Sequence, residues 1–482
     1  MEAAQLQEHL TRPRGIGHVP RGASTGAAGG ARCGDLVRLS VSIERDRVTD
    51  AGFAARGCAT LTAAASAAVA LVRGRSVLDA ARVGPDRVAA ELGGLIAPKR
   101  HAADLAADAL HRALGSAVRR QATTAAEPRR VLVAMSGGVD SAVAALLCDR
   151  GGDEVAAVTL ELWADRDNDA ERSCCSAQAV RVARALAHGM GLPHFTLDLR
   201  AEFGAGVVEP FVEDHRAGLT PNPCVRCNGH VRLDAMLDFA GRLGAPALAT
   251  GHYARVTSDG EGPVLRSAAD PAKDQSYMLA AVAPATLARL RFPLGELRKP
   301  QVRELAGAAG LPVATKAESQ DLCFLAGTDR QTFLARHGGM RELPGEIVDR
   351  RGRVLGRHRG QHAFTVGQRR GIGVAAAQPL YVLAKDPAAN RVTVGPRPQL
   401  GRSRVVVAGA TLHRDAARVD RVKLRYRSRP VLCRVAGHPP AGRHRRLELE
   451  LGEPVEGAAP GQLACLMSGD LVVGHATIAP YA

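Results

Sequence analysis

The sequence predicts a chain of several domains organised around an α/β core with a doubly wound parallel sheet. The 482 residues exceed the length of one ordinary domain, and 46% of them are hydrophobic, which is enough for several cores. Between residues 129 and 328, short apolar runs alternate with helical patterns, as in successive βαβ units. Such sheets bind their ligands at the carboxyl ends of the strands, so we expect the main site there.

The core elements follow from the apolar runs and the patterns between them. Helices are expected at residues 141–150 and 176–189. Strands are expected at Val131–Met135, Val155–Leu160, His194–Leu199 and Ala247–Thr250.

A glycine-rich turn, Ser136-Gly137-Gly138-Val139-Asp140-Ser141, directly follows the first of these strands and opens a helix. A strand that turns through glycines into a helix presents backbone N–H groups and the positive helix end to a phosphate. Gly137 and Gly138 permit close backbone approach, and Asp140 and Ser141 offer oxygen ligands for the Mg²⁺ that accompanies ATP. No Gly-Lys-Ser/Thr follows, so the turn is not a Walker P-loop.

This turn resembles the SGGxDS loop of the PP-loop ATP pyrophosphatases, which use ATP to adenylate a substrate oxygen. The resemblance implies an ATP site with Mg²⁺. It implies as nucleotide-binding residues Ala134, Met135, Ser136, Gly137, Gly138, Val139, Asp140, Ser141, Leu160 and Gly251.

Residues 1–117 predict a separate compact α+β domain. Strands are expected at Leu36–Ile43 and Val48–Phe53, and helices at Ala59–Val72 and Ala102–Leu114. Residues 118–128 lack an apolar period and end in Pro128, so we expect a linker there.

Three polar motifs punctuate this domain: CGD at 33–35, GCA at 57–59 and KRH at 99–101. In this order they resemble the NifU/IscU scaffold family of iron–sulfur cluster assembly. The resemblance implies one site built from Cys33, Asp35, Cys58 and His101, and thiolate plus imidazole suits zinc or a [2Fe–2S] cluster. The family's third cysteine follows the histidine, where this chain has Ala102. A degenerate domain kept for docking or stability is therefore the alternative.

Further motifs run in order from residue 129 to the C-terminus. They are TPNPCVRCN at 220–228, ATGHY at 249–253, KDQSY at 273–277, FPLG at 292–295, SQDLCF at 319–324, FTVGQRRG at 364–371, RYR at 425–427 and PGQ at 460–462. Together they resemble the tRNA-specific 2-thiouridylases, which make 2-thiouridine at the wobble position. The resemblance implies a PP-loop thiolase domain at 129–328, a small central tRNA-binding domain at 329–400 and a C-terminal β-barrel at 401–482.

Short alternating segments after residue 401 independently favour a small barrel. The expected strands are Arg404–Ala408, Arg421–Tyr426, Val431–Val435, Arg446–Leu451 and Gln462–Met467.

Two cysteines acquire catalytic roles through the motif match. Replacing the C2 oxygen of uracil by sulfur requires a leaving group, which ATP supplies, and a nucleophilic sulfur. The resemblance implies that Cys323 carries the sulfur as a persulfide. It implies that Cys227 resolves the intermediate through a Cys227–Cys323 disulfide.

Position 224 departs from many family members, which carry Asp there. Cys224 forms a C-x-x-C pair with Cys227. With Cys323, this pair could ligate three irons of a [4Fe–4S] cluster, hold zinc or act as a redox dithiol. Cluster-bound sulfide and a simple persulfide relay remain open alternatives for the sulfur source.

The resemblance also implies tRNA contacts. Asn222, Pro223 and Cys224 match the stretch at the target base. Other tRNA-contacting positions are matched by His252, Lys273, Asp274, Gln275, Arg425, Tyr426 and Gln462. A formal net charge of +16 suits a polyanionic partner such as RNA, although an arginine-rich composition alone would also produce it.

We expect a cytoplasmic enzyme, because the chain has neither a run of about 18 apolar residues nor a signal-peptide pattern. The expected partners are tRNA and a cysteine desulfurase or other sulfur donor, without a membrane. One rival function is that of another PP-loop ligase that amidates its substrate, but amidation needs no paired cysteines. The other is a non-catalytic iron–sulfur carrier that binds tRNA, which the intact 136–141 loop and Cys227 and Cys323 argue against.

Overall fold

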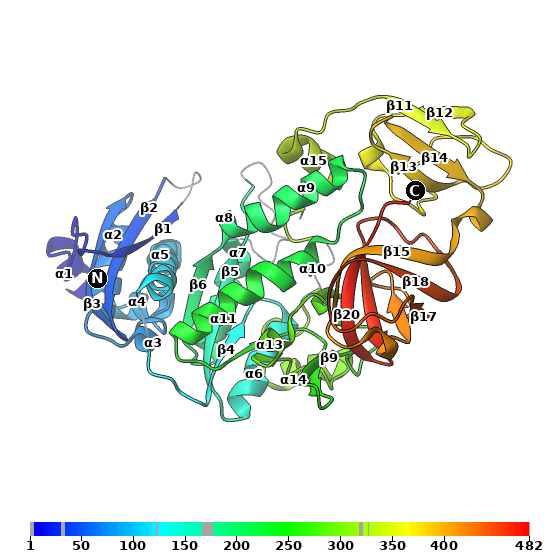
Figure 1. The fold of residues 1–482 in the computed structure, drawn as a ribbon. Helices are drawn as coiled ribbons and strands as arrows, with labels where there is room; N and C mark the ends of the chain where they lie inside the picture. The colour runs from blue at the N-terminus through cyan, green and yellow to red at the C-terminus, as the bar shows by residue number, and fades with distance from the viewer. Residues whose placement is uncertain are drawn as a thin grey trace. The chain divides into compact units, whose positions relative to one another are not determined.

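The computed structural model describes residues 4–29, 34–121, 124–165, 177–317, 322–325 and 327–481 (Figure 1). The chain divides into two compact units. The first comprises Met1–Ala201, Asp234–His252 and Arg289–Ala326. The second comprises Glu202–Leu233, Tyr253–Ala288 and Gly327–Ala482.

The N-terminal part of the first unit is an antiparallel sheet covered by helices. The strand order is β1-β2-β3, with β1 at Ser24–Gly29, β2 at Leu36–Glu44 and β3 at Arg47–Arg56. The helices are α1 (Ala4–Thr11), α2 (Ala59–Val72), α3 (Val77–Ala80), α4 (Pro85–Glu91) and α5 (Arg100–Arg120). The predicted α+β class is confirmed, but β1, whose sequence STGAAG has no apolar period, was not predicted.

Helix α5 is longer than the sequence predicted and is buried on most sides. It continues to Arg120 rather than ending at Leu114, because the apolar pattern persists through Ala117 and Val118. Strand β1 lies directly against it: a Cβ on Gly26 would lie 2.1 Å from the Ala109 carbonyl oxygen. This glycine is therefore required for the close contact of strand and helix.

The core of the first unit is a five-stranded parallel sheet, as predicted, with the order β10-β7-β4-β5-β6. Its strands are β4 (Arg130–Ala134), β5 (Glu154–Glu161), β6 (His194–Asp198), β7 (Ala247–Thr250) and β10 (Leu290–Arg291). Its helices include α6 (Val139–Arg150), α7 (Ala177–Gly189), α11 (Leu233–Arg242) and α14 (Lys299–Ala308). Val131, Leu132 and Val133 are fully buried, as expected for a central parallel strand.

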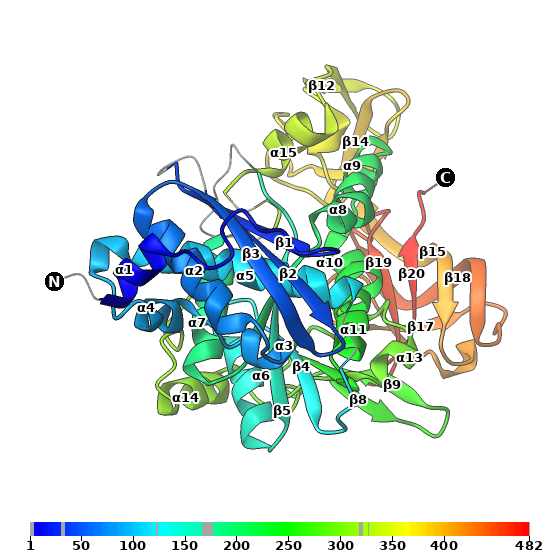
Figure 2. The ribbon, with the colours of Figure 1, turned by 90° about the vertical axis from the view of Figure 1, so that its left-hand side faces the viewer.

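Helix α5 belongs to both parts of the first unit, since it lies between the N-terminal sheet and β6 (Figures 1 and 2). A Cβ on Gly115 would lie 2.1 Å from the Thr196 carbonyl oxygen of β6. Arg112 donates to both carboxylate oxygens of Glu161 at 3.1 Å. The buried Arg184 of α7 pairs with Asp108 of α5. The N-terminal domain and the parallel sheet therefore share a packed, charge-matched interface.

The second unit begins within α8 (Arg200–Phe203) and contains short helices and two β structures. Its short helices are α9 (Glu209–Arg216), α10 (Pro223–Cys227), α12 (Ser276–Leu279), α13 (Pro284–Leu287) and α15 (Arg330–Gly338). A four-stranded sheet has the order β12-β11-β14-β13. These strands are β11 (Gly345–Val348), β12 (Val354–His358), β13 (Tyr381–Asp386) and β14 (Arg391–Gly395).

The predicted C-terminal barrel is confirmed and is closed. Its order is β15-β18-β17-β16-β19-β20, and β15 also pairs with β20. The strands are β15 (Gly401–Leu412), β16 (Arg421–Lys423), β17 (Val431–Val435), β18 (Gly442–Glu456), β19 (Leu463–Ser468) and β20 (Leu471–Ile478). An unpredicted hairpin, β8 (Arg255–Ser258) and β9 (Pro263–Arg266), extends the barrel sheet from β20. None of the described helices is long and apolar enough to cross a membrane.

Candidate nucleotide, metal and cysteine sites

The glycine turn after β4 has the geometry of a phosphate-binding loop. Gly137 has a φ of +72°, and a Cβ there would lie 2.9 Å from the Ala179 carbonyl oxygen. Gly138 precedes the first residue of α6, so the N-terminus of this helix points at the turn. The Ser141 hydroxyl accepts from the Ser136 amide at 3.1 Å and donates to the Gly138 carbonyl at 3.0 Å. These bonds hold the turn in shape without a ligand.

The end of β7, the strand next to β4 in the sheet, packs against the turn. Gly251 follows β7, and a Cβ there would lie 2.8 Å from the Ser141 amide nitrogen. Only glycine lets the end of β7 approach the start of α6 this closely. Met135 and Val139 are buried, whereas Ala134 and Leu160 are half-buried at the carboxyl ends of their strands. The predicted nucleotide-binding residues therefore gather at one edge of the sheet.

Two lysines that sequence reasoning missed reach this turn from distant segments. The Lys299 ammonium group lies 2.6 and 2.8 Å from the Asp140 carboxylate oxygens. The Lys316 ammonium group donates to the Gly137 carbonyl at 2.9 Å. Lys299 follows the FPLG motif by only a few residues, which was the one signal available in the sequence. Two ammonium groups beside a ring of backbone amides suit a polyphosphate.

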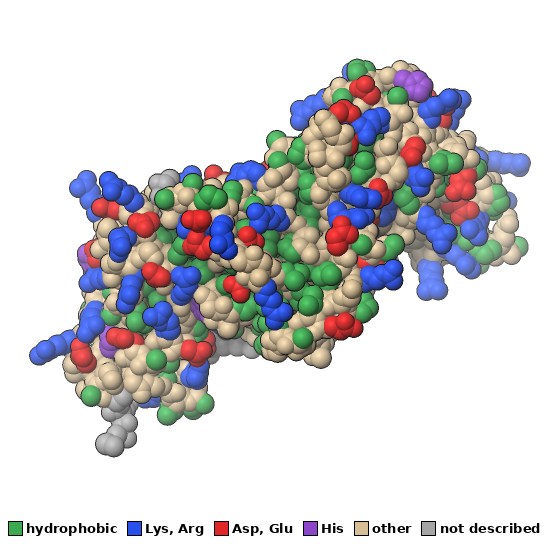
Figure 3. All heavy atoms as spheres, turned by 90° about the horizontal axis from the view of Figure 1, so that it is seen from below, with side chains coloured by type: hydrophobic (Ala, Val, Ile, Leu, Met, Phe, Trp, Pro, Cys, Tyr) green, Lys and Arg blue, Asp and Glu red, His purple; other side chains and the backbone are tan. Residues whose placement is uncertain are grey.

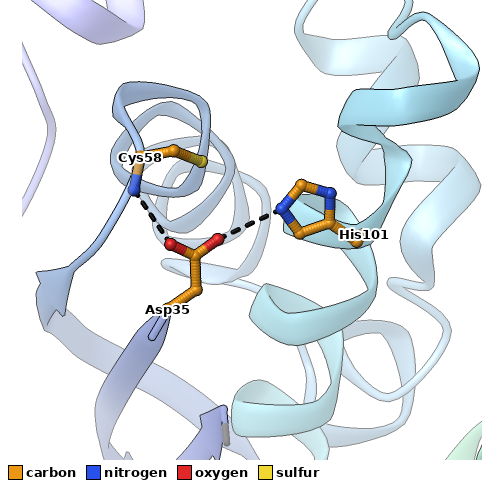
Figure 4. A group of neighbouring side chains, drawn as sticks. All are labelled: Asp35, Cys58 and His101. Carbon is orange, nitrogen blue, oxygen red and sulfur yellow. Dashed lines mark hydrogen bonds and ion pairs between the residues drawn. The ribbon is translucent and has the colours of Figure 1, made fainter. Parts of the chain in front are cut away.

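In the N-terminal domain, Asp35, Cys58 and His101 converge from three elements (Figure 4). Asp35 precedes β2, Cys58 precedes α2 and His101 lies in the first turn of α5. Their potential ligand atoms all lie within 4.8 Å of one another. The Cys58 amide donates to Asp35 Oδ1 at 3.0 Å, and His101 Nε2 lies 3.1 Å from Asp35 Oδ2. Carboxylate, thiolate and imidazole together form a donor set suited to zinc or iron.

The local chemistry keeps the Asp35 carboxylate charged. Burial opposes ionisation, but the hydrogen bonds from the Cys58 amide and His101 lower the pKa of Asp35 overall. Gly57 makes this possible, because a Cβ there would overlap Asp35 Oδ1. The GCA motif therefore has a steric basis: its glycine admits the carboxylate beside the cysteine.

Two further positions limit this site. Cys33, predicted to be a fourth ligand, lies outside the described residues. Ala102, at the position of the family's third cysteine, is fully buried and offers no donor atom. The described residues thus fit a single metal ion through three donors.

The motif cysteines of the thiolase segment lie in different units. Cys224 and Cys227 occupy α10 in the second unit, three residues apart and so on one side of that helix. Asn222 caps α10 through a 3.4 Å bond from the Val225 amide. Cys227 is buried, Cys224 is half-buried, and Cys323, in the first unit, is half-buried. Cys174 and Cys175 lie outside the described residues.

Three other cysteines are packed in cores. Burial raises the pKa values of Cys148, Cys433 and Cys465 to about 12. Thiols with such pKa values are poor nucleophiles at neutral pH, so these residues serve packing.

Several predicted tRNA-contacting side chains hold the second unit together. Gln462 Nε2 donates to the Thr220 carbonyl at 2.6 Å, which ties the barrel to the loop before α10. Gln275 Oε1 accepts from the Tyr253 amide at 2.9 Å. Asp274 accepts from the Ser276 hydroxyl at 2.9 Å and pairs with Lys423. These three residues position the segments that carry the motifs.

The other predicted contacts differ in exposure. His252 Nδ1 lies 2.7 Å from the Thr250 hydroxyl, and His252 is buried in the first unit. Arg425 donates to the Val366 carbonyl at 3.1 Å, and its neighbour Tyr426 lies 6.3 Å from the Tyr277 ring centroid. Pro223 is buried and Lys273 is half-buried. On the face in Figure 3, Lys and Arg side chains are spread among acidic ones rather than gathered in one patch.

Comparison with known protein families accounts for nearly the whole chain. The NifU-like N terminal domain matches residues 1–124, and the tRNA methyl transferase HUP domain matches residues 129–327. The tRNA methyl transferase PRC-barrel domain matches residues 331–396, and the aminomethyltransferase beta-barrel domain matches residues 410–478.

Among individual relatives, a bifunctional protein NifU/MnmA from Rubrobacter xylanophilus is 46% identical over 98% of this chain and 97% of its own. The chain belongs to the family of bifunctional NifU/MnmA proteins. A tRNA-specific 2-thiouridylase MnmA from Chloroflexus aggregans is 44% identical over 72% of this chain and 98% of its own. That of Geobacter metallireducens is 42% identical over 72% and 95%. The MnmA relatives thus lack a counterpart for more than a quarter of the bifunctional chain.

Proposed function

We propose that this protein catalyses ATP-dependent 2-thiolation of the wobble uridine of tRNA. The observation that carries the proposal is the preformed Ser136–Ser141 turn at the carboxyl edge of the parallel sheet, with Lys299 and Lys316 beside it. Its relatives named tRNA-specific 2-thiouridylase support the choice of substrate.

The turn and its neighbours bind ATP in this proposal. The amides of Gly137–Val139 and the two lysines would hold the phosphates, while Asp140 and Ser141 are positioned for Mg²⁺. Leu160 and Gly251 would line the nucleotide. ATP supplies the leaving group for the C2 oxygen of the uridine. Because Lys299 already neutralises Asp140, its ammonium group must move or share the carboxylate when Mg²⁺ binds.

Sulfur transfer is assigned to Cys323 and Cys227. The terminal sulfur of a Cys323 persulfide bonds to C2 as the activated oxygen departs. The Cys227 thiolate then attacks Cys323 Sγ and breaks the sulfur–sulfur bond, which leaves 2-thiouridine and a Cys227–Cys323 disulfide. An external thiol reductant restores both thiols before the next turnover. Asn222, Pro223 and Cys224 would contact the target base.

A cluster-based route is the alternative within the same function. Cys224, Cys227 and Cys323 would then hold an iron–sulfur cluster that delivers sulfide. The C-x-x-C pair on one helix and the fused NifU-like domain favour keeping this alternative.

The remaining tRNA contacts are assigned by domain. Residues 329–400 and the barrel at 401–482 would hold tRNA together with the thiolase domain at 129–328. The assigned contacts are His252, Lys273, Asp274, Gln275, Arg425, Tyr426 and Gln462. Since Asp274, Gln275 and Gln462 are bonded within the protein, we expect them to act chiefly by holding the loops that touch RNA.

For the domain at 1–117, we propose a metal or cluster site formed by Asp35, Cys58 and His101 with Cys33. The donor atoms within 4.8 Å of one another support it. Ala102 argues against the full cysteine set of a cluster scaffold. A cysteine desulfurase is the expected sulfur source for the chain.

The deciding experiment is anaerobic thiolation of tRNA with Mg-ATP and sulfide, using iron-loaded and iron-stripped protein. Thiolated nucleoside is read by mass spectrometry, with the Cys323→Ser variant as the inactive control. Iron-independent activity when cysteine and a cysteine desulfurase replace sulfide, and so supply persulfide-level sulfur, supports the persulfide relay, whereas activity with sulfide that requires iron supports the cluster. No product in either sample, with a desulfurase also supplied, would refute the proposed function.

A further inference from the structure

Four basic side chains meet in the second unit, around the short helical turn η4 (Gln361–Ala363) that precedes the FTVGQRRG motif. They are His215 of α9, Arg330 of α15, His362 of η4 and Lys385 of β13. The name cationic cluster is used for these four residues. None of them belongs to the site residues assigned above.

Two of the charges point at consecutive backbone carbonyls. Arg330 donates to the Ala363 carbonyl at 3.1 Å and to the Thr365 hydroxyl at 3.4 Å. Lys385 donates to the Phe364 carbonyl at 3.0 Å. A guanidinium group and an ammonium group are therefore held on neighbouring residues of the same segment.

The surrounding contacts make the arrangement rigid. His215 is buried and its Nδ1 lies 2.8 Å from the Phe211 carbonyl of its own helix. Gln361 donates to the His215 carbonyl at 3.4 Å, which ties the turn to α9. The rings of Phe211 and Phe333 pack at 6.2 Å, which ties α9 to α15. These contacts fix α9, α15 and the η4 turn relative to one another.

The part of the chain that the structure describes places no counter-charge at the cluster. Among the described residues, no carboxylate lies within ion-pair distance of any of its four members. Burial lowers the pKa of Arg330, and burial together with Arg330 lowers the pKa of Lys385 to about 8. Burial, followed by the charges of Arg330, Lys385 and His362, lowers the pKa of His215 to about 4. Arg330 Nε is also buried without a hydrogen-bond partner in the described structure.

Buried cations without an anion are unfavourable, because the protein interior replaces water poorly as a solvent for charge. An incoming anion would recover this energy. Arg330, His362 and Lys385 are half-buried, so the cluster is not sealed from solvent. The exposed Arg369 and Arg370 follow a few residues later in the sequence.

We propose that the cationic cluster binds a phosphodiester group of the tRNA backbone and so anchors the RNA to the central domain. A phosphate fits this set because a guanidinium and an ammonium group both donate to its oxygens. The inference rests on the proposed function for the identity of the RNA. Its chemistry, a basic cluster with no carboxylate nearby among the described residues, stands without it.

The test measures binding of unmodified tRNA to the full chain at several salt concentrations. Lys385→Gln and Arg330→Gln should each weaken binding about fivefold to tenfold and reduce the slope of log K against log salt by about 1. Arg38→Gln, which removes one exposed charge from β2, is the matched control and should leave both unchanged. In turnover, KM for tRNA should rise while kcat stays within about twofold.

Thermal unfolding of the same variants separates binding from folding. Because each substitution removes an unmatched cation, the melting temperature should not fall. A variant that melts lower would be replaced by Lys385→Met, and unchanged tRNA affinity in a stably folded variant overturns the proposal.

A second arm distinguishes RNA from a free anion. Inorganic phosphate and pyrophosphate are titrated against the wild type and Lys385→Gln, with melting temperature as the readout. Phosphate could raise the melting temperature of the wild type but not of Lys385→Gln, while both proteins bind tRNA equally well. This result would assign the cluster to a free anion and refute the RNA assignment. Lys385-dependent tRNA binding in a protein that never thiolates tRNA would keep this inference and refute only the proposed function.

Discussion

The nucleotide turn and the cationic cluster each contain a lysine whose ammonium group bonds to other protein groups, but the partners of the two ammonium groups differ in charge. At the turn, Lys299 lies 2.6 Å from the Asp140 carboxylate. In the cationic cluster, the partners of Lys385 and Arg330 within the described part of the chain are carbonyl and hydroxyl oxygens. A lysine that is paired with a carboxylate is already stabilised without a ligand. A lysine without a carboxylate partner gains more interaction energy when an anion binds.

The cavity between β1, α5 and the ends of β5 and β6 shows the same distinction. It has a volume of about 750 Å³ and four arginines in its lining. Arg112 is matched by Glu161, and Arg200 by Asp198. Arg120, in the same cavity, donates to the Ser24 hydroxyl and the Ala23 carbonyl, so this cavity holds both matched and, among the described residues, unmatched arginines. In the cationic cluster, no described carboxylate lies within ion-pair distance of any member.

The largest effect is expected where a matched buried pair is broken. Asp108→Ala leaves Arg184, which is only 2% exposed, without its carboxylate. We expect a loss of about 3–5 kcal/mol in the free energy of unfolding of the first unit. Urea denaturation measures it. Asp79→Ala, which breaks the exposed pair with Arg82, is the control and should cost under about 1 kcal/mol.

Acid should protonate a cluster of three buried histidines that are neutral at pH 7, and so place positive charges in the core. His111, His188 and His194 lie together where α5 meets the parallel sheet, with ring centroids 5.2 to 6.3 Å apart. Burial lowers all three pKa values, that of His188 to about 4. Because the histidines bind protons less readily in the folded state than in the unfolded state, their contribution to the free energy of unfolding is fully present above pH 6.5. It is lost as the pH falls from 6.5 to about 4.

His188 alone accounts for about 3 kcal/mol of this loss. Urea midpoints at pH 7, 5.5 and 4.5 measure it, and His188→Gln should flatten the pH dependence by that share. An equally steep dependence in the variant would contradict the assignment.

Removing the matched lysine at the nucleotide turn should affect chemistry more than folding. Lys299→Gln is expected to lower kcat for tRNA-dependent pyrophosphate release about 100-fold, because the proposed positive donor to the phosphates is lost. Lys385→Gln should leave kcat nearly unchanged. If both variants lost kcat equally, the distinction between the two lysines would be wrong.

The N-terminal site differs from the cationic cluster, since its Asp35 carboxylate lies beside His101 and the Cys58 thiol. Asp35→Asn keeps the shape but removes the charge, and should weaken zinc or ferrous iron binding at least about tenfold. Anaerobic competition with a chromophoric chelator measures it. Asp46→Asn, away from the three ligands, should leave the affinity unchanged; a parallel loss there would point to a general charge effect.

The smallest effect tests the cost of the unmatched charge itself. Lys385→Gln should raise the free energy of unfolding of the second unit by about 1 kcal/mol in the absence of RNA. Urea denaturation with and without tRNA measures it, and the sign should reverse when tRNA is present. A loss of stability without tRNA would show that the Phe364 contact outweighs the unmatched charge.

Local patterns in the sequence were sufficient for the parallel sheet, the glycine turn and much of the barrel. Apolar runs and glycine turns depend on residues that are close together in the chain, so they can be recognised in the sequence. The turn at 136–141 followed from its glycines. The resemblance to the NifU/IscU family implied that Asp35, Cys58 and His101 converge together with Cys33, which lies outside the described residues. The helix that became α5 was predicted too short, and β1 was missed, because its small residues pack against α5 rather than forming an apolar face.

Tertiary structure alone decided which charges are matched. Lys299 meets Asp140 across 159 positions of sequence, and Lys385 meets Phe364 across 21, and neither pairing has a periodic signature. The β8–β9 hairpin joins the barrel from a segment that reads as part of the core. The sequence by itself determined the local elements and the chemical groups. The folded chain decided their partners, because the energy of a charged group depends on the protein groups that replace its water of hydration.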